Sequence, residues 1–342
     1  MTKHNIYLYL LVLLSFELYA QNKTFTITPV VEPNTSIRAV HKTSNGELWF
    51  TGSNGYYGFS EDQGNTWQID SIQFLNQTMH FRALGSSSRG INIISIESPG
   101  MIFRTENKGK SWFLSYYEEG EKVFYDAVKF YDQLEGIALG DPIDGCFSIL
   151  KTYDGGETWT KMSCETIPEI IEGEAAFAAS NTNIETIGDS TWIVTGGKVA
   201  RVLFSPDRGN SWETLESPII SGDQMTGIYS VDFYNNDIGV IIGGDWNDKS
   251  YSKNNKAITF NGGKSWKLLS KKKDPPYQSC IKFIPNSNGK SIISVGIPGV
   301  YYSENSGRSW IKVSDESFYA VEFINSNRAI LTGNKKISIL TF

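Results

Sequence analysis

The stretch SEDQGNTW at residues 60–67 recurs five more times along this chain of 342 residues. The other copies are TENKGKSW at 105–112, TYDGGETW at 152–159, SPDRGNSW at 205–212, TFNGGKSW at 259–266 and SENSGRSW at 303–310. All follow the pattern Ser/Thr-x-Asp/Asn-x-Gly-x-Ser/Thr-Trp, and successive tryptophans are 45, 47, 53, 54 and 44 residues apart. Six copies at a near-constant period predict an array of structural repeats.

Each position of the repeat has a local structural reason. Asp or Asn accepts backbone N–H bonds inside a tight turn, Gly adopts a positive φ, and the Ser/Thr hydroxyls bond the turn to itself. The tryptophan then packs the turn against a neighbouring element. We therefore interpret Asp62, Asp154 and Asp207 as turn-forming residues and not as catalytic ones.

With these six segments the chain resembles the Asp-box (BNR repeat) β-propellers, which include sialidases, xyloglucan-active hydrolases, sortilin-like receptors and the photosystem II stability/assembly factor. The segments ALGDPIDG (138–145), EGEAAFAASNT (172–182) and IIGGDWN (241–247) look most similar to exported bacterial relatives of the assembly factor. The resemblance covers nearly the whole chain after the first 20 residues. It implies the fold more firmly than the function, because one fold hosts many functions.

Every period also divides into four strand-like runs separated by turns. In the first period these runs are 36–42, 47–51, 56–60 and 67–72. The last run, 318–342, holds only three, and residues 24–31 (TFTITPVV) offer the fourth. Pairing the two would remove an open sheet edge. We predict an all-β, seven-bladed β-propeller with six Asp-boxes, a single domain over residues 21–342, closed by pairing of the N- and C-terminal strands.

Residues 1–20 have the features of a secretory signal peptide: a cation at Lys3, an apolar run over 6–16 and the small residue Ala20. The apolar run is too short for a membrane span, and no later run is longer. We therefore expect a periplasmic or secreted protein without a membrane span. The net charge of −6 and the pI near 5.3 argue against a nucleic-acid partner. We expect a monomer.

Cofactor and metal chemistry find little support in the sequence. Only His41 and His80 follow the signal peptide, and no G-x-G-x-x-G segment opens a helix. Asp245, Asn247 and Asp248 offer oxygen ligands for calcium, but the closing Glu of the 12-residue calcium loop is absent. We predict no cofactor and no metal.

Three cysteines are too few for a disulfide scaffold. Cys146 and Cys164 lie symmetrically about Gly155, the centre of the third repeat turn, so a bridge between them is conceivable in an exported protein.

The expected topology places the functional site on one face. If the strands of a blade are labelled A to D outward from the channel, the A starts and the B–C loops lie opposite the Asp-boxes, because the strands alternate in direction. The A starts bear Arg38, Arg82, Asp126, Glu174, Tyr229, Tyr277 and Tyr319. Two B–C loops are irregular, and they bear Asp141 in GDPIDG (140–145) and Asp245 and Trp246 after Gly244. We predict a ligand in the axial depression of this face.

Two chemistries suit these residues. Asp141, Glu174 and Asp245 are candidate catalytic carboxylates for glycoside cleavage. Arg38 and Arg82 could hold a carboxylate or sulfate by bidentate bonds, or form a salt bridge to Asp126 or another carboxylate of the ring. The other candidate ligand-binding residues are Asp126, Tyr229, Trp246, Tyr277 and Tyr319.

Two functions remain open from the sequence. The first is an exported propeller that binds a polar, anionic, glycan-like ligand, with cleavage of a glycoside by paired carboxylates left open. Sialidases use an arginine cluster of this type, but this chain lacks their Phe-Arg-Ile-Pro segment and offers two arginines, not three. The alternative is a non-catalytic scaffold for a protein client, which the resemblance to the assembly factor implies.

Overall fold

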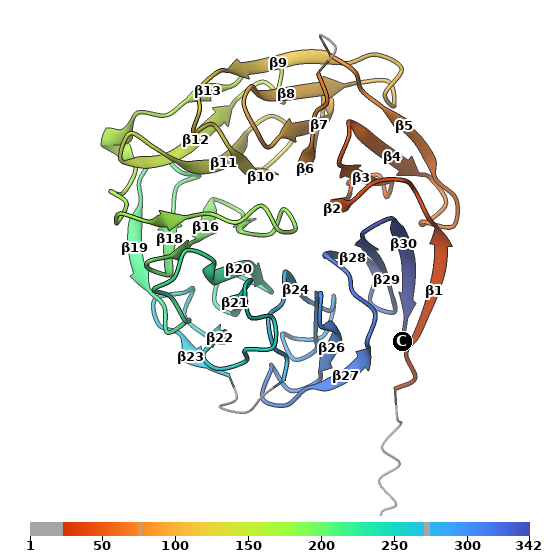
Figure 1. The fold of residues 1–342 in the computed structure, drawn as a ribbon, viewed down its shortest axis with the longest axis vertical. Coiled ribbons are helices and arrows are strands. Elements are labelled where there is room, and N and C mark those ends of the chain that lie inside the picture. Colours follow the sequence, from red (N-terminus) through yellow and green to blue (C-terminus); the bar gives the residue numbers. More distant parts are fainter. Residues whose placement is uncertain (1–22, 75–76, 270–273) are drawn as a thin grey trace, which may run out of the picture.

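A computed structural model describes residues 23–74, 77–269 and 274–342, so the predicted signal peptide lies outside the described residues. Seven antiparallel sheets surround a central channel, as Figure 1 shows, and the fold is a seven-bladed β-propeller. The described part has a single helical element, the 3-10 turn η1 (Cys164–Thr166). No helix in these three ranges is long and apolar enough to cross a membrane.

Blades one to three follow one another along the chain. Blade one contains β2 (Ile37–Lys42), β3 (Leu48–Gly52), β4 (Tyr56–Ser60) and β5 (Gln68–Ser71). Blade two contains β6 (Phe81–Ser87), β7 (Gly90–Ser95), β8 (Gly100–Thr105) and β9 (Phe113–Glu118). Blade three contains β10 (Tyr125–Phe130), β11 (Gly136–Ile143), β12 (Cys146–Thr152) and β13 (Thr160–Lys161).

Blades four to seven complete the ring. Blade four contains β15 (Ile184–Ile187), β16 (Ser190–Val194), β18 (Arg201–Ser205) and β19 (Glu213–Glu216). Blade five contains β20 (Thr226–Phe233), β21 (Gly239–Asp245), β22 (Lys256–Thr259) and β23 (Lys267–Leu268). Blade six contains β24 (Cys280–Phe283), β25 (Ile292–Gly296), β26 (Gly299–Ser303) and β27 (Ile311–Ser314). Blade seven contains β28 (Ala320–Asn325), β29 (Arg328–Gly333), β30 (Lys336–Thr341) and, as its outer strand, β1 (Thr26–Val31).

The hydrophobic core lies between neighbouring blades. The second and third strands of a blade are covered on both faces, so β3, β8 and β25 are buried along their whole length. The outermost strands, such as β5 and β19, are mostly exposed. In blade seven β1 pairs antiparallel with β30, with Ile27 opposite Leu340, so strands from both ends of the described chain share one sheet.

The repeated turns form the hydrogen bonds that their composition predicts. In the first turn, Asp62 Oδ1 accepts from the Thr66 backbone N–H at 2.9 Å and Asp62 Oδ2 accepts from the Thr66 hydroxyl at 2.7 Å. Gly64 has a φ of 83° and donates its N–H to Ser60 Oγ at 2.9 Å, and Trp67 Nε1 donates to the Gly64 carbonyl at 3.1 Å. The bonds from Thr66 lower the pKa of Asp62 to about 2. Both oxygens of this carboxylate therefore accept hydrogen bonds within the turn.

Cys146 and Cys164 form a disulfide, with their Cα atoms 5.6 Å apart. The bridge joins the start of β12 to η1, beyond the turn that is centred on Gly155. The sequence had left this bond open. Cys280 is a buried free thiol.

Four of the innermost strands contain a β-bulge at the same place. In β2, Ile37 pairs with Gly52 and Ala39 with Thr51, which leaves Arg38 as an extra residue without a partner in β3. The equivalent extra residues are Arg82 in β6, Asp126 in β10 and Tyr229 in β20. A bulge redirects a side chain from the regular alternation of the strand, and bulges often lie next to functional sites.

Blade four corrects one sequence expectation. We expected its innermost strand to run on from Glu174, but that strand is interrupted: β14 (Glu174–Ala175) pairs with β17 (Gly196–Gly197), and the chain re-enters the blade only at β15. Eight residues, 176–183, separate Ala175 from Ile184, whereas only Val194 and Thr195 separate the residues with which those two pair. Where the four other innermost strands have a bulge of one residue, the innermost strand of blade four has an excursion of eight residues.

We call residues 176–183 the septum, because this green segment projects into the middle of the ring in Figure 1. Asn181 fixes it to two blades: Nδ2 donates to the Leu84 carbonyl at 2.9 Å, and Oδ1 accepts from the Val128 N–H at 3.0 Å. On the other side, Ser180 Oγ donates to the Ser279 carbonyl at 2.7 Å. The septum therefore crosses the channel, bonding blades two, three and six.

Candidate ligand-binding site

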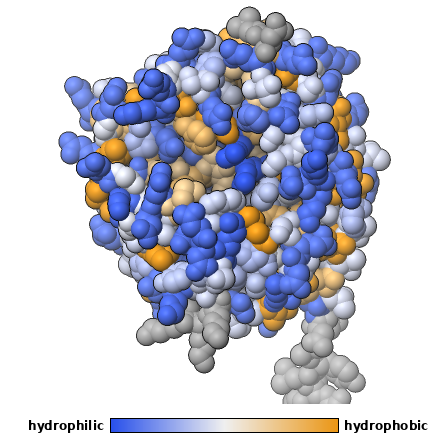
Figure 2. All heavy atoms as spheres, viewed as in Figure 1, coloured by the Kyte–Doolittle hydropathy of each residue, from blue (hydrophilic) through white to orange (hydrophobic). Residues whose placement is uncertain are grey.

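A pocket of about 260 Å³ lies at the channel mouth that is formed by the strand starts and the B–C loops, opposite the repeated turns. Figure 2 shows a hollow near the centre of the ring in which hydrophobic residues are visible. Six predicted residues line the pocket: Arg38, Arg82, Asp141, Tyr229, Trp246 and Tyr277. Sequence reasoning missed the rest of the lining, which is Phe124, Ala175, Ala176, Phe177, Ala178, Ala179, Gln224 and Met225. We call this cavity the axial pocket.

The two arginines of the axial pocket have no carboxylate partner in the described part of the chain. The Arg38 guanidinium lies over the ring of Tyr319, 4.2 Å from its centroid, and its Nη1 donates to the Ala179 carbonyl at 3.5 Å. Burial, together with the nearby charge of Arg38, lowers the pKa of Arg82 to about 10, so the Arg82 side chain remains cationic at neutral pH. The sequence left two roles open for these arginines, which were binding of an anionic ligand and a salt bridge to a carboxylate of the ring. The salt bridge to Asp126 does not form among the described residues.

Two carboxyl groups of blade three lie beside these cations. Asp141 Oδ1 accepts from the Ala176 N–H of the septum at 2.9 Å, and burial raises the pKa of Asp141 to about 6. Asp126 is fully buried, and neither of its carboxyl oxygens meets a hydrogen-bond donor among the described residues. Burial, followed by the charge of Asp141, raises the pKa of Asp126 well above its usual range. A carboxyl group that is buried without a hydrogen-bond donor favours its neutral form.

Aromatic rings form one wall of the pocket. Phe177 of the septum stacks on Tyr229, with ring centroids 4.1 Å apart and planes at 9°. Tyr277 meets Tyr229 edge to face at 4.8 Å and Trp246 at 5.5 Å. The Tyr229 hydroxyl donates to the Met225 carbonyl at 2.8 Å, which fixes its ring. Such rings offer apolar faces to a ligand whose charged group meets the arginines.

Glu174, one of the three carboxylates that we predicted to be catalytic, does not line the axial pocket. Its side chain is fully buried, Oε1 accepts from the Thr195 hydroxyl at 2.7 Å and from Arg201 Nε at 3.0 Å, and Oε2 forms a second bond to Arg201. An ion pair within the protein thus occupies this carboxylate.

Asp245 also lies outside the pocket lining. Its Oδ1 accepts from the Asn247 N–H at 2.7 Å and braces the turn that follows β21. The structure brings only Asp141 of the three predicted catalytic carboxylates into the pocket. No cluster of three or more His, Cys, Asp or Glu side chains that could hold a metal occurs among the described residues.

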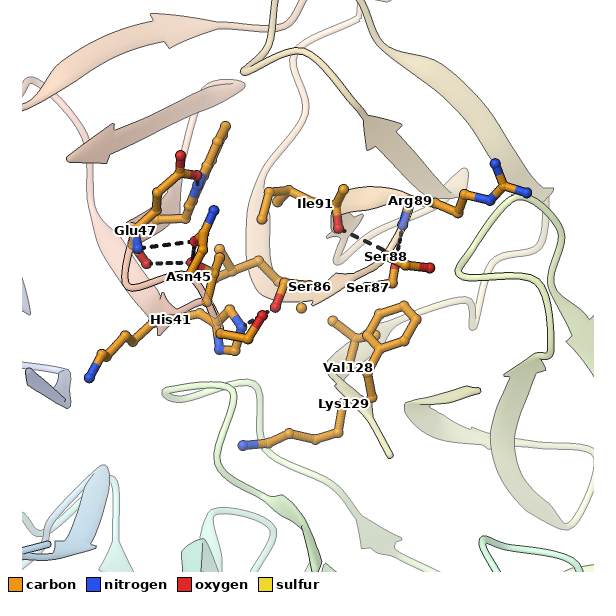
Figure 3. A pocket seen from close by; sticks show the side chains of 18 of the residues that line it. His41, Asn45, Glu47, Ser86, Ser87, Ser88, Arg89, Ile91, Val128 and Lys129 are labelled. Carbon is orange, nitrogen blue, oxygen red and sulfur yellow. Dashed lines mark hydrogen bonds between the residues drawn. The ribbon is translucent and has the colours of Figure 1, made fainter. Parts of the chain in front are cut away.

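A second cavity, of about 760 Å³, opens on the face of the repeated turns, beyond the septum. Figure 3 shows His41, Ser86 and Lys129 around it, from three neighbouring blades. Its central charges are paired within the protein: Glu185 lies 3.3 Å from Lys129 Nζ and 3.4 Å from Lys282 Nζ. Burial lowers the pKa of His41 to about 3, so this ring is neutral. The Glu185 carboxylate in this cavity is therefore paired with two lysines, whereas the arginines of the axial pocket have no carboxylate partner among the described residues.

Comparisons with known proteins support the fold. No protein-family model matches the chain, and no curated protein does. Among solved structures, "YCF48 bound to D1 peptide" superposes with a TM-score of 0.67 at 13% identity, covering 93% of this chain and 97% of that one. YCF48 from Cyanidioschyzon merolae gives 0.64 at 14% identity, covering 93% and 99%.

A GH74 xyloglucanase from Xanthomonas campestris is also similar, with a TM-score of 0.65 at 12% identity, covering 92% of this chain and 53% of that one. This chain thus spans about half the length of that enzyme. The neighbours include a protein that binds a peptide and a glycoside hydrolase. At these identities the likeness concerns the β-propeller fold alone, because one fold hosts unrelated functions.

Proposed function

We propose that this protein is an exported Asp-box propeller that binds an anionic, glycan-like ligand in the axial pocket. In this proposal the six repeated turns are Asp-boxes, the pairing of β1 with β30 closes the ring, and residues 1–20 direct export. Arg38 and Arg82 hold the acid group of the ligand, and the aromatic wall contacts its apolar faces.

One observation supports the proposal above all others: two cationic side chains face a partly enclosed pocket with no carboxylate of the chain within ion-pair distance among the described residues. Unpaired buried charge is costly, and arginine holds a carboxylate or sulfate by two parallel hydrogen bonds. A bound anion would satisfy both side chains at once. Tyr319 and Trp246 flank Arg38 and limit its freedom before a ligand arrives.

The geometry favours binding over glycoside cleavage. Cleavage requires two carboxyl groups on opposite sides of the scissile bond, about 5–10 Å apart. Glu174 is bonded to Arg201, and Asp245 braces a turn, so neither faces Asp141 across the axial pocket. Asp126 is adjacent to Asp141 in blade three, not opposite it. A protein client with an acidic segment is the alternative occupant of the same arginines.

The test is calorimetric titration of the purified chain with a panel of uronic acid oligosaccharides and with neutral oligosaccharides of equal length. We expect binding of the acidic members only, and a loss of at least tenfold in affinity for Arg38→Ala and for Arg82→Ala, because a charge-assisted hydrogen bond contributes about 1.5–3 kcal/mol. Arg89→Ala, on the opposite face, is the matched control and should bind normally. Equal binding of neutral and acidic sugars, or no binding of either, would contradict the proposal.

A further inference from the structure

Asp141 lines the axial pocket, and Asp126, next to it in blade three, is buried outside the pocket lining. Asp126 is the extra residue of the bulge in β10, and Asp141 follows Gly140, which pairs with Tyr125 beside that bulge. Asp141 has one oxygen engaged by the Ala176 N–H. Neither oxygen of Asp126 has a donor among the described residues, although the side chain is fully buried. The charge of Asp141 and the burial of Asp126 both disfavour ionisation of Asp126.

Asp126 is buried without a donor and favours its neutral form. Asp141 lines the pocket and accepts the Ala176 N–H, so it is the member of the pair that bears the negative charge. Arg38 and Arg82 line the same pocket, and neither is paired to a carboxylate of the described chain. The charged residues that line the axial pocket thus sum to a single net positive charge. A ligand with a single negative charge matches this charge.

We infer that Asp141 makes the axial pocket selective for a monoanionic, hydroxylated ligand, a sugar with one singly charged acid group, and that it rejects dianions such as phosphorylated sugars. The acid group of the ligand lies against the two arginines, and a ligand hydroxyl donates to the Asp141 oxygen that Ala176 leaves free. This inference rests on the proposed function. A second negative charge on the ligand would lie near Asp141 without a cation to balance it.

The same residue links binding to pH. The titratable and charged groups around Asp141 are Asp126, Arg82 and Arg38, with Glu97 and Tyr319 next to Arg82. Asp141 is the group whose raised pKa, about 6, falls between pH 5.0 and 7.5. As the pH falls through this range Asp141 takes up a proton, the pocket gains one positive charge, and affinity for a carboxylate ligand rises. A sugar carboxylate with a pKa near 3.5 stays ionised throughout.

The test compares D-glucuronate, glucose 6-sulfate and glucose 6-phosphate as probes, titrated calorimetrically into the wild-type chain and into Asp141→Asn at pH 7.5. We expect the wild type to bind the two monoanions more tightly than the phosphate. Asp141→Asn removes the pocket's negative charge, so it should shift the phosphate-to-glucuronate affinity ratio toward phosphate on the order of tenfold. The affinity of the wild type for glucuronate should also rise between pH 7.5 and 5.0, and that of Asp141→Asn should not.

Asp126→Asn is the matched control. Because Asp126 is buried without a donor and lies outside the pocket lining, its amide replacement should leave the affinity ratio of the probes unchanged. A ratio that shifts in Asp126→Asn and not in Asp141→Asn would place the charge on Asp126 and overturn the inference. Equal affinity of the wild type for glucose 6-phosphate and glucuronate would also overturn the inference. The proposed function would stand in that case, because the pocket would still bind an anionic sugar. If no probe binds the wild type, the proposed function fails and this inference fails with it.

Discussion

Replacing Glu174 with Gln separates a structural role of this residue from a catalytic one. Its carboxylate is fully buried and forms two bonds to Arg201, whose side chain is 12% exposed. Removing one partner of a buried pair leaves the other charge uncompensated, which costs about 3–5 kcal/mol. The amide oxygen of Gln can still accept one of the bonds, so we expect a loss of about 2–3 kcal/mol in the free energy of unfolding. For a chain of this size that corresponds to a fall in Tm of roughly 5 °C.

The assay is urea denaturation followed by tryptophan fluorescence, with Glu172→Gln as control because Glu172 is exposed two residues earlier. Arg201→Met should cost less in the Glu174→Gln background than in the wild type, since no unpaired charge then remains. Binding in the axial pocket should persist at temperatures well below Tm. The reasoning is refuted if Glu174→Gln is as stable as Glu172→Gln, or if it abolishes a glycan activity while stability stays unchanged.

Three further perturbations test other parts of the structure. Joint replacement of Cys146 and Cys164 by Ala opens a loop with a sequence separation of 18 and should cost about 3 kcal/mol in unfolding free energy; reductant should destabilise the wild type equally, and no change would argue against the bridge. Asn181→Ala leaves two buried backbone groups unpaired and should lower the free energy of unfolding by about 2–4 kcal/mol in the same assay. An unchanged free energy of unfolding would show that Asn181 does not anchor the septum. Asp141→Asn should stabilise the fold at pH 7.5 and not at pH 4. The folded-state pKa of Asp141 is raised from 3.8 to about 6, so the wild type gains stability as Asp141 takes up a proton at low pH. A stability difference that does not depend on pH would contradict this.

The fold was predictable from the sequence because its determinants are local and repeated. Each repeat turn specifies its own hydrogen bonds through residues within eight positions, as the Asp62 turn shows. The three strands at the C-terminus required a fourth, and residues 26–31 supply it in the structure. The strand bounds differ from the expected ones by one or two residues, as in β3, which begins at Leu48 where we expected 47.

The site was predictable only in part, because bulges and excursions depend on contacts between distant segments. Arg38, Arg82 and Tyr229 were assigned to the mouth from their place at strand starts, and they line the pocket. Glu174 was assigned to the mouth by the same rule, but the structure places it outside the pocket lining. The residue with which it pairs, Arg201, lies in β18, and no sequence period connects the two. The apolar lining from the septum was missed because AAFAAS resembles an ordinary core strand until its lack of partners is known.

The septum gives a physical reason why the axial pocket, with its two arginines, lies on this face of the ring. A regular innermost strand alternates its side chains, so it cannot direct residues from several blades to one point on the axis. One-residue bulges place Arg38, Arg82, Asp126 and Tyr229 out of that alternation. The excursion in blade four supplies a floor of Ala and Phe beneath them and a backbone N–H for Asp141. Loss of the septum would therefore open the pocket into the polar cavity behind it, where water would weaken every charge interaction on which ligand selectivity depends.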